Sequence, residues 1–131
     1  MEGEGLAFSI RIDGKSGVPL YRQIIEQVEF AVARKDLEPG DQLPTVRQLA
    51  VELSINPNTV LRAYREMEIK GVLDTQQGSG TFVSMQRPEI GQGERSRMLD
   101  QIVMEMLARA SRYGFSVDDV LDGLKQRQEM T

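Results

Sequence analysis

The apolar residues between positions 19 and 70 fall into three stretches of helical spacing, each followed by a short break in the pattern. Apolar side chains that recur every three or four residues lie on one face of an α-helix. The positions concerned are Leu20, Ile24, Val28, Ala31 and Val32, then Val46, Leu49, Ala50 and Leu53, then Val60, Ala63, Tyr64 and Met67. The pattern therefore predicts three helices that each bury one face in a shared core.

The second and third predicted helices have well-marked starts and almost nothing between them. Thr45, with Gln48 three residues later, fits a capping box, in which two side chains satisfy free amides at a helix start. Asn56 is a favoured N-cap residue, and Pro57 follows it at a position where the missing N–H costs nothing. Only residues 54–55 separate the two patterns, so a sharp turn must join the helices. The sequence predicts a helix-turn-helix.

After the third helix the pattern changes to short runs typical of strands, which predicts a β-hairpin over residues 72–84. Its tip is Gly78-Ser79-Gly80, with Thr75 and Thr81 on either side. Glycine allows positive φ and lets the backbone approach another surface closely. If the preceding helix binds DNA, that surface would be the phosphates and the minor groove. An ordinary tight turn is the alternative, and the tip alone does not decide between them.

The outward side of the third predicted helix carries Asn58, Thr59, Leu61, Arg62 and Arg65. Asn can bond adenine in two places and Arg can bond guanine in the same way, while Leu can touch a thymine methyl. A solvated polar face would fit these residues equally well on their own. The hairpin that follows favours the alternative of a nucleic-acid interface.

The flanking segments have simpler patterns. Residues 6–12 alternate apolar and other side chains, which predicts a short strand or an extended arm lying across the domain. Pro39 and Gly40 suit the middle of a type II turn between the first two helices. We expect a domain over residues 1–84 with an N-terminal arm over 1–17, a linker over 85–93, and a helical tail over 94–131.

The tail pattern predicts two short helices separated by Gly114, with Ser116 and Asp119 as a capping box for the second. Segments of fewer than about 40 residues rarely fold alone without disulfides, metal or association. We therefore expect the tail to pair with a second copy, and fold-back onto its own domain is the alternative. The predicted dimer interface comprises Met98, Leu99, Ile102, Met106, Val117, Val120, Leu121 and Leu124.

Composition limits the classes of function. The chain has 131 residues with neither histidine nor cysteine, which excludes the usual metal clusters, imidazole bases and thiol nucleophiles. We predict no catalytic residue, no metal and no cofactor. No apolar run is long enough to span a membrane and no signal-peptide pattern begins the chain, so we expect a cytoplasmic protein.

Net charge gives no support for nucleic-acid binding. The formal net charge is −4, whereas nucleic-acid binders are usually basic. Residues 1–84 hold 9 Lys and Arg against 12 Asp and Glu, a net charge of −3, so the deficit is not confined to the tail. Nucleic-acid binding would therefore depend on the local charge at the contact surface, where Arg47, Arg62 and Arg65 could form a basic ridge.

Several blocks in order carry a family resemblance: Pro19-Leu20-Tyr21, the run from Leu37 to Ala50, Asn56-Pro57-Asn58-Thr59-Val60, and Gly78-Ser79-Gly80-Thr81-Phe82-Val83. Together they resemble the winged-helix domain of GntR-type bacterial transcription regulators over residues 15–84. The short two-helix tail is similar to that of the YtrA-like subfamily. The resemblance implies a mainly α fold with a small β wing, namely a winged helix-turn-helix with a helical dimerisation appendage.

The resemblance also implies roles for matching positions. Arg47 matches a DNA-contacting arginine of the family, and the predicted recognition helix and wing follow it. The expected DNA-binding residues are Thr45, Arg47, Asn58, Thr59, Arg62, Arg65, Gly78, Ser79, Gly80 and Thr81. Many relatives have basic residues where this chain has Pro57 and Leu61, so its operator cannot be borrowed from them.

The protein implied by the resemblance is a homodimeric repressor that binds a palindromic operator in double-stranded DNA and controls a nearby operon, such as one encoding a transporter. An unknown small-molecule effector, if there is one, would sit at the domain junction or the dimer interface. The alternative function is a winged-helix module that binds another protein through the same outward face.

Overall fold

A computed structural model of the chain describes residues 8–86 and 90–129. The chain divides into two compact units, residues 1–87 and residues 88–131. The first unit contains α1 (Leu20–Arg34), β1 (Gln42–Leu43), α2 (Val46–Leu53), α3 (Pro57–Ile69), β2 (Leu73–Gln76) and β3 (Gly80–Val83). The second contains α4 (Gln92–Arg112) and α5 (Val117–Glu129). The fold is mainly helical with a small antiparallel sheet, as the sequence predicts.

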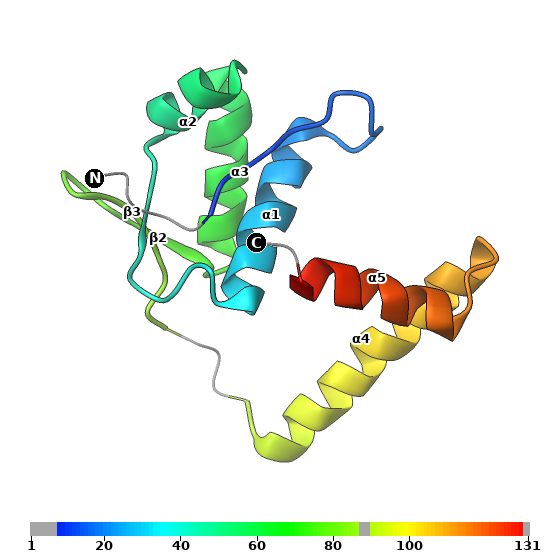
Figure 1. The fold of residues 1–131 in the computed structure, drawn as a ribbon. Helices are drawn as coiled ribbons and strands as arrows, with labels where there is room; N and C mark the ends of the chain where they lie inside the picture. The colour runs from blue at the N-terminus through cyan, green and yellow to red at the C-terminus, as the bar shows by residue number, and fades with distance from the viewer. Residues whose placement is uncertain (1–7, 87–89, 130–131) are drawn as a thin grey trace. The chain divides into compact units, whose positions relative to one another are not determined.

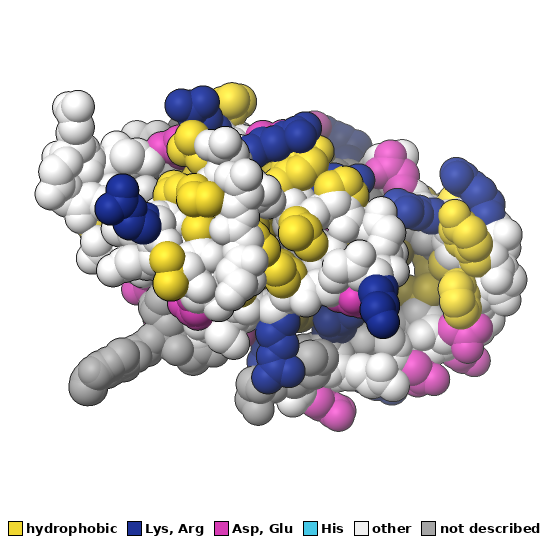
Figure 2. Space-filling model, turned by 90° about the horizontal axis from the view of Figure 1, so that it is seen from above, with side chains coloured by type: hydrophobic (Ala, Val, Ile, Leu, Met, Phe, Trp, Pro, Cys, Tyr) yellow, Lys and Arg dark blue, Asp and Glu magenta, His cyan; other side chains and the backbone are white. Residues whose placement is uncertain are grey.

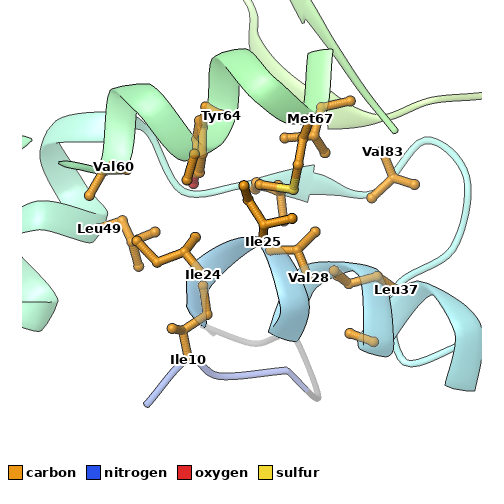
Figure 3. Close-up of a cluster of buried hydrophobic side chains, with 14 of the residues drawn as sticks. Ile10, Ile24, Ile25, Val28, Leu37, Leu49, Val60, Tyr64, Met67 and Val83 are labelled. Atoms are coloured by element: carbon orange, nitrogen blue, oxygen red, sulfur yellow. The ribbon is translucent and has the colours of Figure 1, made fainter. Parts of the chain in front are cut away.

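The three helices of the first unit enclose one apolar core. α3 packs against both α1 and α2, and Figure 1 shows α1 and α3 side by side. Ile24 and Val28 of α1 meet Val60 and Met67 of α3 in this core, and all four are completely shielded from solvent. The close-up in Figure 3 shows the α1 and α3 side chains pointing toward one another. The predicted apolar stripes are therefore the buried faces.

The local signals at the helix ends also operate as expected. Thr45 and Gln48 form the complete capping box at the start of α2, with each side chain bonded to the other residue's amide. The Asn56 side chain accepts a hydrogen bond from the Asn58 amide, with Pro57 as the first residue of α3. Ser54 ends α2 in the left-handed conformation at φ 56°. The left-handed Ser54 and the Asn56 cap fix the sharp turn between α2 and α3.

The sheet has three antiparallel strands in the order β1-β3-β2. The hairpin of β2 and β3 is the predicted one, and Thr75 lies opposite Thr81 in its register. The third strand, β1, is not predicted by the sequence. It is only two residues long and pairs Leu43 with Thr81, and such a short pairing leaves no alternation to detect. Gly40 precedes it at φ 90°, in the turn expected there.

The N-terminal segment is an extended arm and not a strand. Residues 8–12 form no strand, and Ile10 inserts into the core while its neighbours stay outside. Two glutamines of α1 hold the arm, because Gln27 bonds the amide and carbonyl of Arg11 and Gln23 bonds those of Asp13. Side chains thus supply the backbone partners that a neighbouring strand would have supplied. Residues 6 and 7 of the predicted pattern lie outside the described residues.

The second unit is a pair of helices. α4 begins at Gln92, inside the stretch predicted to be a linker, because Gly91 takes the N-cap position and Glu94 suits the first turn. Gly114, at φ 83°, follows its end. Ser116 and Asp119 form the predicted capping box, with each side chain bonded to the other's amide. The hydrogen bond from the Ser116 amide lowers the pKa of Asp119, and its bond to the Ser116 side chain adds to this effect.

Candidate nucleic-acid interface

Helix α3 presents one face to the core and the other to solvent. Val60, Ala63, Tyr64 and Met67 are buried, and the Tyr64 hydroxyl donates a 2.7 Å hydrogen bond to the Pro44 carbonyl just before α2. Burial raises the pKa of this hydroxyl well above its usual value, with a smaller contribution from Glu52. The helix is therefore locked in rotation about its axis, and the same side always faces outward.

That outward side carries Asn58, Arg62 and Arg65, whose side chains are exposed. Thr59 and Leu61 are half-buried, so they lie at the edges of the exposed face and not at its centre. All five are at the positions expected from the helical spacing. Among the described residues Arg65 has no ion-pair partner, which leaves its guanidinium available to a ligand.

Arg62 is held differently. Its guanidinium carbon lies 3.7 Å from the centre of the Tyr21 ring of α1, and its Nε is 3.6 Å from a Glu66 carboxylate oxygen. The side chain nevertheless remains 61% exposed. The sequence places Arg62 on the correct face but gives no sign of Tyr21 as its neighbour, because helical spacing does not report contacts between helices.

Helix α2 contributes Arg47, which is exposed in its first turn. Within the described part of the chain Arg47 also lacks an ion-pair partner. Thr45 is exposed too, but its hydroxyl accepts the Gln48 amide in the capping box. Thr45 therefore positions the start of α2, and its hydroxyl can still donate its hydrogen to a ligand.

The predicted wing is a tight hairpin tip that is held by a hydrogen bond from β1. Gly78 and Gly80 have φ values of 82° and 125°, which glycine adopts without strain. Ser79 is exposed between them, and its carbonyl accepts a 3.0 Å hydrogen bond from the Gln42 side chain. Gln42 thus braces the tip against β1. Neither residue composition nor spacing identifies it, since the bond joins positions far apart in the chain.

Thr81 corrects one expectation, because its side chain is 9% exposed and does not lie on the wing surface. Its hydroxyl is 3.3 Å from that of Thr75 across the hairpin, and Thr75 in turn bonds Glu68 of α3. Strand alternation turns Thr81 inward along with Val83, whereas Gly78 and Ser79 are exposed and Gly80 is half-buried. Thr75 thus connects the hairpin to α3, and Thr81 contacts Thr75 from the opposite strand.

Charge on the surface is dispersed. Figure 2 shows Lys and Arg side chains separated by neutral polar and apolar surface on the face that it draws, with no continuous basic patch. Several acids of the first unit are engaged by cations, as in the pairs Lys70–Glu29 and Arg34–Asp36. Arg47, Arg62 and Arg65, from which a basic ridge is expected, all have exposed side chains.

The tail helices have no buried residue. Seven of the eight predicted dimer-interface residues are classed as exposed, and Val120 is half-buried. Val103 and Met104 of α4 are exposed as well, as are Tyr113 and Phe115, which the prediction did not include in the interface. The structure brings the predicted set onto two adjoining helices and leaves it uncovered.

Two further requirements concern the part of the chain that the structure describes, those of a metal site and of a membrane-spanning helix. No cluster of three or more acidic residues in the described ranges could hold a metal ion. Of the helices that the structure describes, none combines the length and the apolarity that crossing a membrane requires.

Residues 20–83 match the family model of the bacterial regulatory proteins of the gntR family. This is the segment from the start of α1 to the end of β3, and it contains the helix-turn-helix and the wing. The chain belongs to the GntR family. The prediction from the sequence motifs is confirmed, as is the winged helix-turn-helix architecture of a transcriptional regulator.

Similarity extends through the tail in some family members. The chain is 34% identical to the HTH-type transcriptional regulator YhcF of Bacillus subtilis, over 85% of this chain and 91% of that protein. It is 32% identical to the HTH-type transcriptional repressor YtrA of Bacillus subtilis, over 89% and 90%. A crystal structure of a transcriptional antiterminator from Listeria monocytogenes superposes with a TM-score of 0.70 and 25% identity, over 92% and 90%. These matches bear out the resemblance to the YtrA-like subfamily.

Proposed function

We propose that this GntR-family regulator binds an inverted-repeat operator as a homodimer and represses transcription. Each copy would place α3 in the major groove and the wing tip on the phosphates or in the adjoining minor groove. The observation that carries the proposal is the fixed orientation of α3, which buries Val60, Tyr64 and Met67 and leaves Asn58 and Arg65 exposed. Repression is the activity named for the similar YtrA protein.

The side chains on the outward face have the chemistry of base recognition. Asn and Arg can each make paired hydrogen bonds to a base edge in the major groove. Asn58 stands in the first turn of α3, and Arg65 lies two turns later on the same side. Helix-turn-helix proteins contact bases mainly through the N-terminal half of the second helix. Asn58 meets that requirement, and Arg65 extends the same face into the C-terminal half of α3.

Dimerisation supports the proposal because the first unit is acidic overall. A domain with a net negative charge gains less affinity from phosphate neutralisation, which supplies most non-specific binding. Two linked domains on one duplex would raise the effective affinity without new contacts. The uncovered apolar residues of α4 and α5, such as Ile102 and Leu121, are a suitable surface for linking two copies.

Fluorescence anisotropy with a labelled random duplex tests the DNA-binding proposal directly. We expect measurable affinity at low salt that falls steeply as the KCl concentration rises, because binding releases counterions from the phosphates. Arg47→Ala is the variant for comparison and should bind the duplex more weakly, since the Arg47 side chain is exposed on the proposed surface. Salt-insensitive or absent DNA binding by the wild-type chain would favour the alternative of a protein-binding winged helix.

A further inference from the structure

Arg62 is oriented before any ligand arrives. Its guanidinium lies against the Tyr21 ring at 3.7 Å from the ring centre, and Glu66 holds one edge at 3.6 Å. A guanidinium is planar and directs its N–H groups within its own plane. Stacking on an aromatic face therefore fixes the plane of the group while leaving the outer N–H donors free to bind an anion.

The contacts of Arg62 place it on the flank of α3 that faces α1. Arg62, Glu66 and Lys70 are spaced by four residues and so form one row along the helix. The Lys70 ammonium nitrogen lies 3.6 Å from Glu29 of α1, which shows that the row runs beside α1. Arg62 lies where this row meets the exposed face, and it is 61% exposed.

We propose that Tyr21 positions the Arg62 guanidinium to bind a phosphate of the duplex backbone, and that Glu66 is the anion the phosphate displaces. The proposal rests on the proposed DNA-binding function and assigns a ligand group to one residue of that site. A helix seated in the major groove has base edges beneath it and phosphates along the groove walls. A cation held on its flank therefore faces a wall, whereas Arg65 faces the bases.

Glu66 has a definite part in this arrangement. In the free protein it pairs with Arg62, and in the complex it would repel the incoming phosphate. Glu26 and Glu29 line the same groove between α1 and α3, but each has its own cation there, Arg22 and Lys70, so Glu66 is the carboxylate that faces Arg62. Removal of the Glu66 charge should consequently strengthen binding to any duplex.

The test uses the full chain and anisotropy titrations of a random duplex and of a selected operator over a KCl series. The variants are Arg62→Ala, Tyr21→Phe, Tyr21→Leu, the double variant Tyr21→Leu/Arg62→Ala, and Glu66→Gln. Phe30→Leu is the matched control, because Phe30 is also an α1 ring beside an arginine, at 5.7 Å from Arg34, and it lies outside the proposed site. Circular dichroism checks the folding of every variant.

We expect Arg62→Ala to weaken binding to both duplexes by the same factor and to reduce the salt slope by about 1. Tyr21→Leu should shift in the same direction and should add nothing to Arg62→Ala. Tyr21→Phe keeps the ring and should match the wild type, as should Phe30→Leu, while Glu66→Gln should bind both duplexes more tightly.

Three results would overturn the inference. Loss of operator binding in Arg62→Ala with unchanged random-duplex binding would make Arg62 a base reader. If Tyr21→Leu folds and binds both duplexes as tightly as the wild type, the ring does not position Arg62. If Tyr21→Leu does not fold, an unchanged DNA affinity of Glu66→Gln would contradict the proposal. Failure of the wild-type chain to bind DNA would instead contradict the proposed function itself.

Discussion

The side chains of α3 fall into two groups: some are buried and hold the helix against the core, and others are exposed to solvent. Tyr64 belongs to the first group, since its ring is buried and its hydroxyl is bonded to Pro44. Arg65, the next residue, belongs to the second, because a step of one residue turns the side chain by about 100° around the helix axis. Adjacent positions thus have opposite roles, and each role makes its own prediction.

Arg65→Ala is expected to relax sequence discrimination. Loss of a paired hydrogen bond to a base costs about 1–3 kcal/mol at the operator, whereas random duplexes lose much less. The ratio of operator affinity to random-duplex affinity, measured by anisotropy, should fall accordingly. Arg109→Ala removes an exposed arginine from the tail and is the control. An unchanged ratio for Arg65→Ala would mean that this face does not read bases.

Tyr64→Phe is expected to lower the free energy of unfolding by roughly 1–3 kcal/mol at neutral pH, because the Pro44 carbonyl loses its donor. The folded-state pKa of Tyr64 is raised, so the wild type keeps its full stability below about pH 10 and loses it as the unfolded chain ionises above that value. The variant should lack this alkaline loss. Urea unfolding at pH 8 and pH 11 measures both effects. Tyr113→Phe, at an exposed tyrosine, should show neither.

Among the elements, the helices were the easiest to predict and the sheet the hardest. Apolar spacing and caps such as Thr45 and Asn56 act within a few residues, so the sequence alone locates α2 and α3. The β1 strand, the inward turn of Thr81 and the stack of Arg62 on Tyr21 depend on contacts between distant segments. Periodicity carries no information about such contacts, and these are the features that sequence analysis missed.

The geometry of the wing depends on Gly80, the glycine at the start of β3. Gly80→Ala would place a Cβ 2.6 Å from the Gln42 amide nitrogen, at a φ of 125° that side chains rarely adopt. Gln42 would have to move and give up its hydrogen bond to Ser79. We expect a loss of stability of about 1 kcal/mol or more, together with weaker binding to every duplex.

Thermal unfolding and anisotropy measure these two effects of Gly80→Ala. Gly14→Ala is the matched control, because an added Cβ there meets nothing within 4 Å and its φ lies outside the restricted range. Its stability should stay within about 0.5 kcal/mol of the wild type. Equal behaviour of the two variants would show that the wing tolerates a different tip.

The oligomeric state of the whole molecule depends on whether the tail helices of two copies associate. Ile102 is 57% exposed on α4 among other uncovered apolar residues, and a charge there should prevent their burial. We expect Ile102→Glu to be a monomer in sedimentation experiments at concentrations where the wild type is a dimer. Ser96→Glu adds the same charge to α4 at an exposed polar position and should remain dimeric. A dimeric Ile102→Glu would place the interface elsewhere.

Selection of bound fragments from a random DNA pool, followed by sedimentation of the complex with the selected duplex, tests the central claim most directly. The claim is that two copies each present the Asn58–Arg65 face of α3 to one duplex. The account predicts an inverted repeat with half-site centres about one helical turn apart, or a multiple of that distance, and two chains per duplex. A single unrepeated site bound by one chain, or no enrichment of any sequence, would contradict it.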